Sequence, residues 1–123
     1  MQTRDILEDA YDRIKGGVHR VTDGLTAADL AARPNPDANS IGWLIWHLTR
    51  VQDHHVSDIA GRPQVWTETD WPRRFGLDAD PENHGYGHTT AEVGEVQPES
   101  AAMLREYYDM VHARTAEYLA GIT

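Results

Sequence analysis

The amino-acid sequence predicts an all-α protein: a helical bundle of three long helices and one short helix, with a long loop before the last helix. Three segments of roughly 20 residues repeat apolar side chains at the spacing of an α-helix. No segment shows an alternation of apolar and polar residues strong enough to predict a competing strand. A chain of 123 residues is predicted to form a single domain, residues 1–123.

The first long helix is predicted over residues 3–22, where apolar side chains recur every three or four positions. A short helix is predicted to begin at Thr26, since Asp29 three positions later completes a motif similar to a capping box. Pro34 and Pro36 are expected to end it, because proline cannot continue a helix.

The second long helix is predicted to start after Asn39 or Ser40, either of which can cap its first turn. It is expected to run to residue 60 and to stop at Gly61. The residues predicted for its buried face are Ile41, Leu44, Ile45, Leu48, Gln52, His55 and Ile59. A polar stripe is predicted beside that face, formed by Trp43, His47, His54 and Asp58.

Residues 61–97 show no helical or strand period and are predicted to be a long loop. Loops beyond about 15 residues are uncommon inside a compact domain. Trp66, Trp71 and Phe75 therefore predict an ordered loop with packing of its own. The third long helix is expected to open at Pro98, a residue favoured in the first turn, and to stop at Gly121.

The charge balance argues against two classes of partner. Eleven basic and twenty acidic residues give a formal charge of −9, so phosphate backbones and anionic membranes repel the chain. No apolar run approaches the roughly 18 residues of a membrane span, and no secretory signal is visible. The sequence has no cysteine. A cytoplasmic protein that binds neither nucleic acid nor membrane is expected.

Three histidines lie on the second long helix, where an imidazole can ligate a metal or transfer protons. His47 and His54 are about 10 Å apart along the helix axis, so one metal cannot take both. His47 can supply one ligand to a shared site, or it can simply hydrogen-bond a neighbour. Asp58, four residues after His54, can orient that ring as an outer carboxylate, or it can form a plain surface pair.

The remaining histidines give weaker indications. His55 is predicted to be a core histidine with a hydrogen-bond partner, because it points towards the apolar face. His84 and His88 have i, i+4 spacing but lie between glycines, so they are expected in a loop. That loop can bind a metal, or it can form a turn that docks Tyr86 over the mouth of the bundle. His112 is expected to have a packing role.

Several motifs occur together in this chain. N-S-I-x-W-L-I-W-H-L occupies residues 39–48, Asp-His-His residues 53–55 and Gly-Tyr-Gly-His-Thr residues 85–89, before a helix with a Tyr-Tyr pair. Over essentially its whole length the sequence resembles the DinB-like family, in particular its actinobacterial branch. That family is related to mycothiol-dependent maleylpyruvate isomerase and to bacillithiol transferases.

The resemblance implies a four-helix bundle of up-down-down-up type, often dimeric, that binds zinc or nickel through three histidines. One of these lies on the second helix, where His47 matches it. The other two form a His-x-x-x-His pair on a later helix. The implied activity is that of a transferase or isomerase that uses a low-molecular-weight thiol, with mycothiol among the expected co-substrates.

The sequence departs from this pattern because it lacks the later His-x-x-x-His helix. Three explanations are open. The chain is incomplete at its C-terminus, or it is a short member that has lost the metal, or a second copy supplies other ligands. His84 and His88 are the candidates within the chain for the two missing ligands.

Two functions follow from these patterns. In the first, His47 holds a divalent metal that activates a thiol, and His54, oriented by Asp58, either supports the metal ligands from outside or acts as an acid–base group. The expected walls of the cleft are Trp43, Trp66 and Tyr86. In the second, the chain is a non-catalytic bundle whose bare apolar surface is covered in a symmetric homodimer.

Overall fold

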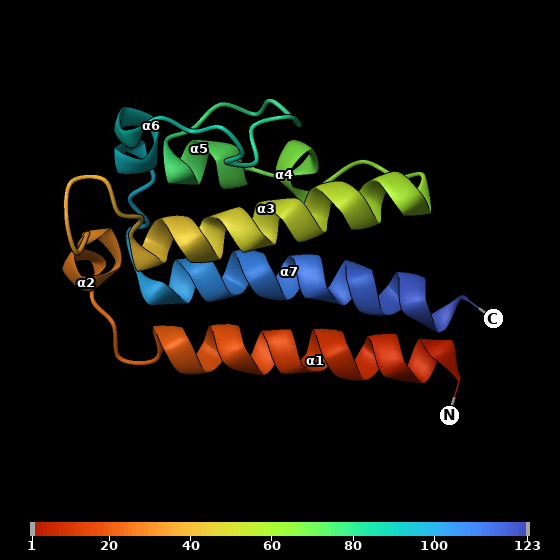
Figure 1. Cartoon of the computed structure of the whole chain (residues 1–123). Coiled ribbons are helices and arrows are strands. Elements are labelled where there is room, and N and C mark those ends of the chain that lie inside the picture. The colour runs from red at the N-terminus through yellow and green to blue at the C-terminus, as the bar shows by residue number, and fades with distance from the viewer. Residues whose placement is uncertain (1, 123) are drawn as a thin grey trace.

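The computed structural model describes residues 2–122, which fold into seven helices (Figure 1). They are α1 (Thr3–Thr22), α2 (Ala27–Ala31), α3 (Ile41–Ala60), α4 (Val65–Glu68), α5 (Trp71–Phe75), α6 (Thr90–Glu95) and α7 (Ala101–Ala120). The predicted all-α bundle with three long helices is confirmed. In this part of the chain, no helix is both long and apolar enough to cross a membrane.

The three long helices lie side by side, with α7 between α1 and α3 (Figure 1). α1 runs opposite to the other two, while α3 and α7 run in the same direction. This is the order expected for the first three helices of an up-down-down-up bundle. Residues 61–97, called the crossover from here on, carry α4, α5 and α6 and lie on the side of α3 away from α1.

The predicted capping residues set the helix ends. The Thr26 hydroxyl accepts from the backbone N–H of Asp29 at 3.1 Å, as the capping box requires. The Ser40 hydroxyl accepts from the N–H of Trp43 at 2.9 Å and so begins α3. Gly61 ends α3 in the left-handed region, with φ of 67°.

The crossover is more regular than its sequence predicts, because it contains three short helices rather than an irregular loop. The expectation that its aromatic residues pack is confirmed. Trp66, Trp71 and Phe75 are all buried, and each ring lies 5.6–5.8 Å from the ring of Tyr107 on α7. Aromatic burial therefore folds the crossover onto α3 and α7.

The predicted start of the last long helix at Pro98 is wrong. α7 begins at Ala101, because the Ser100 hydroxyl accepts from the N–H of Met103 at 3.1 Å and caps it there. Pro98 instead packs against α3. A Cβ added to Gly42 would lie 2.9 Å from the Pro98 ring, so glycine is needed for this close approach.

The predicted buried face of α3 is also partly wrong. Leu44, His55 and Ile59 are exposed, whereas Trp43 is buried rather than part of a polar stripe. The physical reason is that α3 is covered on two sides, by α7 and by the crossover. The side that faces the crossover buries Trp46, Thr49, Arg50, Asp53 and Ser57.

An ion pair inside α3 anchors the crossover. The Asp53 carboxylate accepts from the backbone N–H groups of Val65 and Trp66, at 2.9 and 2.8 Å, and so caps α4. It also accepts from the Tyr107 hydroxyl at 3.0 Å and lies 3.6 Å from the Arg50 guanidinium. Burial, and then the Asp53 charge, raise the pKa of Tyr107 well above its ordinary range, so this hydroxyl stays a donor.

Arg50 holds the later part of the crossover in the same way. Its side chain is 0% exposed and donates to the carbonyls of Asn83 and Pro81, at 2.9 and 3.0 Å. A third bond reaches the Gln64 side chain at 2.8 Å. Every guanidinium nitrogen therefore has a partner, which a buried cation requires.

Polar contacts also join the long helices. The Tyr108 hydroxyl donates to the Gln52 side chain at 3.1 Å, and Gln52 donates to Thr115 at 2.9 Å. Burial raises the pKa of Tyr108 to about 12, so the hydroxyl remains protonated at ordinary pH. Between α1 and α7, buried His112 lies 3.1 Å from Asp12, consistent with its expected packing role.

The buried pair leads to a stability prediction. Asp53→Asn is expected to lower the free energy of unfolding by about 3–5 kcal/mol, because it leaves the Arg50 charge buried without its partner. Asp58→Asn, an exposed site on the same helix, is expected to change it by less than about 0.5 kcal/mol. Urea denaturation followed by circular dichroism measures both, and equal values for the two variants would contradict this role of Asp53.

Candidate functional site between α3 and the 81–88 loop

The His47 ring on α3 is held by the loop that follows α5. Its Nδ1 atom is hydrogen-bonded to the backbone carbonyl oxygen of His84. Because a carbonyl can only accept, Nδ1 must carry the proton and Nε2 is left with its lone pair. No hydrogen bond from residues 2–122 engages Nε2. This is the arrangement in which a histidine serves as a base or as a metal ligand.

Gly85 allows the loop to approach His47 this closely. Its φ is +105°, a conformation that side chains rarely adopt. A Cβ at this position would lie 2.5 Å from His47 Nδ1 and 3.0 Å from the Trp43 ring. The glycine therefore has two roles, one in the turn and one in making room for the two rings.

Two aromatic residues fix the plane of the His47 ring. Trp43 stacks on it with centroids 4.6 Å apart and an interplanar angle of 17°, and Tyr86 meets it edge-on at 4.9 Å. Tyr86 is 65% exposed and so lies at the surface above His47. Trp66, the third expected wall of the cleft, lies instead in the core, where it packs on Trp46 and Tyr107.

His88 has both ring nitrogens engaged in the fold. Nδ1 accepts from the Trp43 indole N–H at 3.1 Å, and Nε2 lies 3.0 Å from the Asn83 side-chain oxygen. The ring also stacks on Trp46 at 5.6 Å. His47, His84 and His88, the expected ligand set, are therefore not brought to one point, because His88 faces the two tryptophans.

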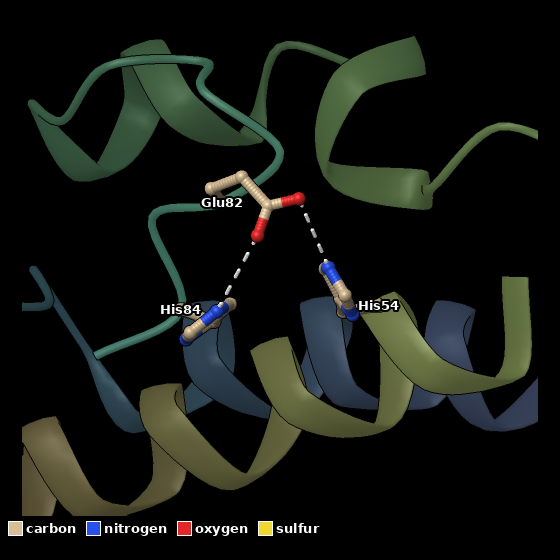
Figure 2. Close-up of side chains that lie close together, drawn as sticks. All are labelled: His54, Glu82 and His84. Atoms are coloured by element: carbon tan, nitrogen blue, oxygen red, sulfur yellow. Dashed lines mark hydrogen bonds and ion pairs between the residues drawn. The ribbon is translucent and has the colours of Figure 1, made fainter. Parts of the chain in front are cut away.

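The structure gathers a different group next to His47. His54 Nε2 lies 3.4 Å from one carboxylate oxygen of Glu82, and His84 Nε2 lies 3.8 Å from the other (Figure 2). No hydrogen bond or ion pair joins His54 to Asp58 in the described chain. Asp58 lines the same surface hollow as His54 and Glu82 but does not orient the His54 ring.

Electrostatics favour a neutral His84 ring. Partial burial, and then the nearby His54 and Arg50, lower the pKa of His84 below its ordinary value. The position of Glu82 between His54 and His84 was not predicted from the sequence. Its position two residues before His84 was the available indication, but Glu82 has many equivalents in so acidic a chain.

A groove between α1 and α3 opens beside His47. Its lining residues are Tyr11, Ile14, His47, Leu48, Val51, Gln52, His55 and Tyr86. The prediction that His55 is a core residue is wrong, since it is exposed at this groove. The volume of about 470 Å³ falls within the range of small-molecule sites, and the lining is mostly apolar with a few polar groups.

The three-histidine metal centre implied by the resemblance is not formed around His47 by residues 2–122. In this part of the chain, one group brings three ligand atoms of His, Asp or Glu within 4.8 Å of one another, and it consists of His54, Glu82 and His84. A metal on His47 would have fewer than three His, Asp or Glu ligands from the described residues. Protein zinc sites take three or four, so these residues alone do not fit the group at His47.

Comparisons of the sequence and the structure with known proteins support the helical-bundle fold. The sequence matches the DinB superfamily over residues 10–123. The structure is similar to the crystal structure of a conserved protein from Enterococcus faecalis, with a TM-score of 0.88 and 26% sequence identity. That similarity covers 100% of this chain and 72% of the other. No curated protein matches the sequence. From its helical order and this match, the chain belongs to the DinB superfamily.

Proposed function

We propose that this domain is a thiol-dependent transferase or isomerase that takes a small thiol, such as mycothiol, into the groove between α1 and α3. The observation that carries the proposal is the His47 ring. Its Nδ1 is tied to a carbonyl, which leaves Nε2 as an acceptor on a residue that lines the groove. Membership of the DinB superfamily supports the proposal, because the family resemblance implies thiol chemistry.

In this proposal His47 is the general base. Nε2 takes the proton of the bound thiol, and the thiolate sulfur then adds to one carbon of an electron-poor C=C bond in the second substrate. The π electrons of that bond move to the neighbouring carbon, which takes the proton back from Nε2, and the reverse of this addition after rotation about the C–C bond gives the isomerase reaction. The imidazolium formed between these steps still donates from Nδ1 to the His84 carbonyl, which stabilises its charge and fixes its orientation. Tyr86 and Tyr11 offer hydroxyl groups at the same groove to position the substrates.

His47→Gln tests the proposed base. The amide of glutamine keeps a donor but has no basic nitrogen, so the rate of mycothiol transfer to a fluorogenic electrophile should fall by about 10²–10⁴-fold. His19→Gln is the control, since it removes a half-buried histidine of α1 that does not line the groove. It is expected to leave the rate unchanged. Equal rates for wild type and His47→Gln, or no transfer by either, would contradict the proposal.

Gly85→Ala tests whether the loop sets the His47 tautomer. The added methyl group should push the loop away from Nδ1 and lower the transfer rate by up to about 10²-fold, as small misplacements of catalytic groups do. Nitrogen NMR of the His47 ring should show the Nδ1–H form in wild type and a mixture in the variant.

Gly87→Ala is the control for Gly85→Ala. Gly87 also has a positive φ, +76°, but a Cβ there meets no atom within 4 Å. Any cost of backbone strain should therefore appear in both variants, whereas the tautomer change should appear only at Gly85. An unchanged His47 spectrum in Gly85→Ala would show that the His84 carbonyl does not set the tautomer.

A non-catalytic homodimer is the second candidate, and an observation on α1 favours it. Ile6, Ile14 and Val21 are 56%, 41% and 52% exposed. They lie within about 80° of one another around the helix, so they share one face. Apolar stripes of this kind are typical of interfaces, and two-fold homodimers are the commonest assembly.

Sedimentation tests the dimer. The wild-type chain is expected to be a dimer at micromolar concentration, and Ile14→Lys is expected to be a folded monomer because it places a charge in the stripe. Ile59→Lys, an exposed site at the far end of α3, should remain dimeric. A wild-type protein that sediments as a folded monomer would rule out the dimer.

A further inference from the structure

We propose that His54, Glu82 and His84 bind a divalent transition-metal ion of the zinc class, at a site separate from His47. Two imidazole nitrogens and one carboxylate oxygen form this donor set. His54 comes from the middle of α3, whereas Glu82 and His84 come from the crossover (Figure 2). The proposal does not depend on the function proposed for His47.

The distances within the group fit an ion better than direct contacts. The gaps from Glu82 to the two rings are 3.4 and 3.8 Å, longer than the 2.7–2.9 Å of a charge-assisted hydrogen bond. Zinc bonds of about 2.0–2.1 Å in a tetrahedral arrangement separate neighbouring ligand atoms by about 3.3 Å. These two gaps run to different oxygens of Glu82. With one ligand atom from each side chain, the three atoms lie within 4.8 Å of one another, so movements of roughly 1 Å bring them to the spacing of a zinc site.

The two rings approach the carboxylate from different directions, as ligands of one ion must. The ring centroids of His54 and His84 lie 5.3 Å apart, and their planes are inclined at 81°. In Figure 2 the Glu82 carboxylate points from its loop towards both histidine rings. The rings neither stack nor block each other, so both Nε2 atoms remain accessible to the ion.

The fold holds the group in place before any ion binds. Arg50 donates to the backbone carbonyls of Pro81 and Asn83, the residues on either side of Glu82. The segment with Glu82 and His84 is therefore fixed against the helix that carries His54. Such preorganisation lowers the entropy lost on binding.

His54 is poorly explained as a purely structural residue. Its Nδ1 atom is buried and has no hydrogen-bond partner in the described chain, so its one polar contact is through Nε2 to Glu82. Glu82 is mostly exposed, which makes that contact worth little as an ion pair. The fold therefore leaves Nε2 of His54 directed at Glu82, on the side where an ion would bind.

The charges near the site also permit a cation. Two positive charges lie near the site, and each has an acidic partner. Arg50 lies 3.6 Å from the Asp53 carboxylate, and Arg62, which lines the same hollow as His54 and Glu82, lies 3.4 Å from Glu117. Glu82 then gives the site a net negative charge. His54 and Glu82 line a surface hollow with Asp58, Ser57 and Gln64, so a fourth position can be taken by water or by a substrate atom. Two histidines and one glutamate plus water are a donor set of catalytic zinc sites.

Binding has one identifiable local cost. The Tyr86 backbone N–H lies 3.4 Å from His84 Nδ1, a long contact in which Nδ1 accepts. An ion on Nε2 would move the ring proton to Nδ1, and this contact would be lost. The Tyr86 amide resonance is therefore expected to shift when zinc binds, which reports on His84 directly.

The test uses the full chain freed of metal. Zinc is titrated by calorimetry, and Co²⁺ by its visible absorption, which reports the geometry of the ligands. One ion per chain is expected. Glu82→Gln and His54→Gln are each expected to bind zinc at least about 100-fold more weakly. Loss of a residue that only hydrogen-bonds a metal ligand already lowers metal affinity about 10–100-fold, and loss of a ligand should cost more. Glu82 is mostly exposed, so Glu82→Gln should fold normally, as circular dichroism will show.

Two controls distinguish this site from its alternatives. His55→Gln removes the exposed histidine next to His54 and should not change the affinity. His47→Gln should also bind normally, although it is the variant expected to lose thiol transfer. Equal affinity in all four variants would show adventitious binding by surface histidines. Loss of binding in His47→Gln but not in Glu82→Gln would place the ion at His47. Either result would overturn the proposal.

Discussion

The Arg50–Asp53 ion pair is the interaction on which the arrangement of this protein depends. Both side chains are buried on one side of α3, where the cost of removing charge from water must be offset by hydrogen bonds. The crossover supplies those bonds. Asp53 accepts from the two backbone N–H groups that open α4, and Arg50 donates to the carbonyls that flank Glu82. A segment with little periodic sequence thus becomes a fixed layer over α3.

The candidate chemistry follows from that layer. Hydrogen bonds from Arg50 hold the crossover at Pro81 and Asn83. The chain then turns at Gly85, whose positive φ lets the backbone pass close to His47. The same segment places a carbonyl on His47 and a carboxylate beside His54. The proposed base and the proposed cation site therefore both depend on the position of the loop of residues 81–88 against α3. They face different hollows, which separates their roles.

Local rules predicted the long helices, because caps and apolar period act within a few residues. Ser40 and Gly61 set the ends of α3 as expected. The buried face of α3 was only partly predictable, since it depends on what covers the helix. Arg50 and Asp53 look like surface residues in sequence, and only the crossover makes them core. The residues at the candidate site show the same limit. His47 was predicted, whereas its partner carbonyl at His84, the glutamate at 82 and the structural role of His88 depend on contacts distant in sequence.

Native-state hydrogen exchange at the Val65 and Trp66 amides tests the role of the buried pair most directly. If Asp53 holds α4 as described, these amides exchange only when the whole domain unfolds. Their opening free energies should then equal that of the α3 backbone and fall with urea at the same slope. Exchange at a much lower free energy, independent of urea, would show that the crossover opens by itself. The ion pair would then not be what organises the fold.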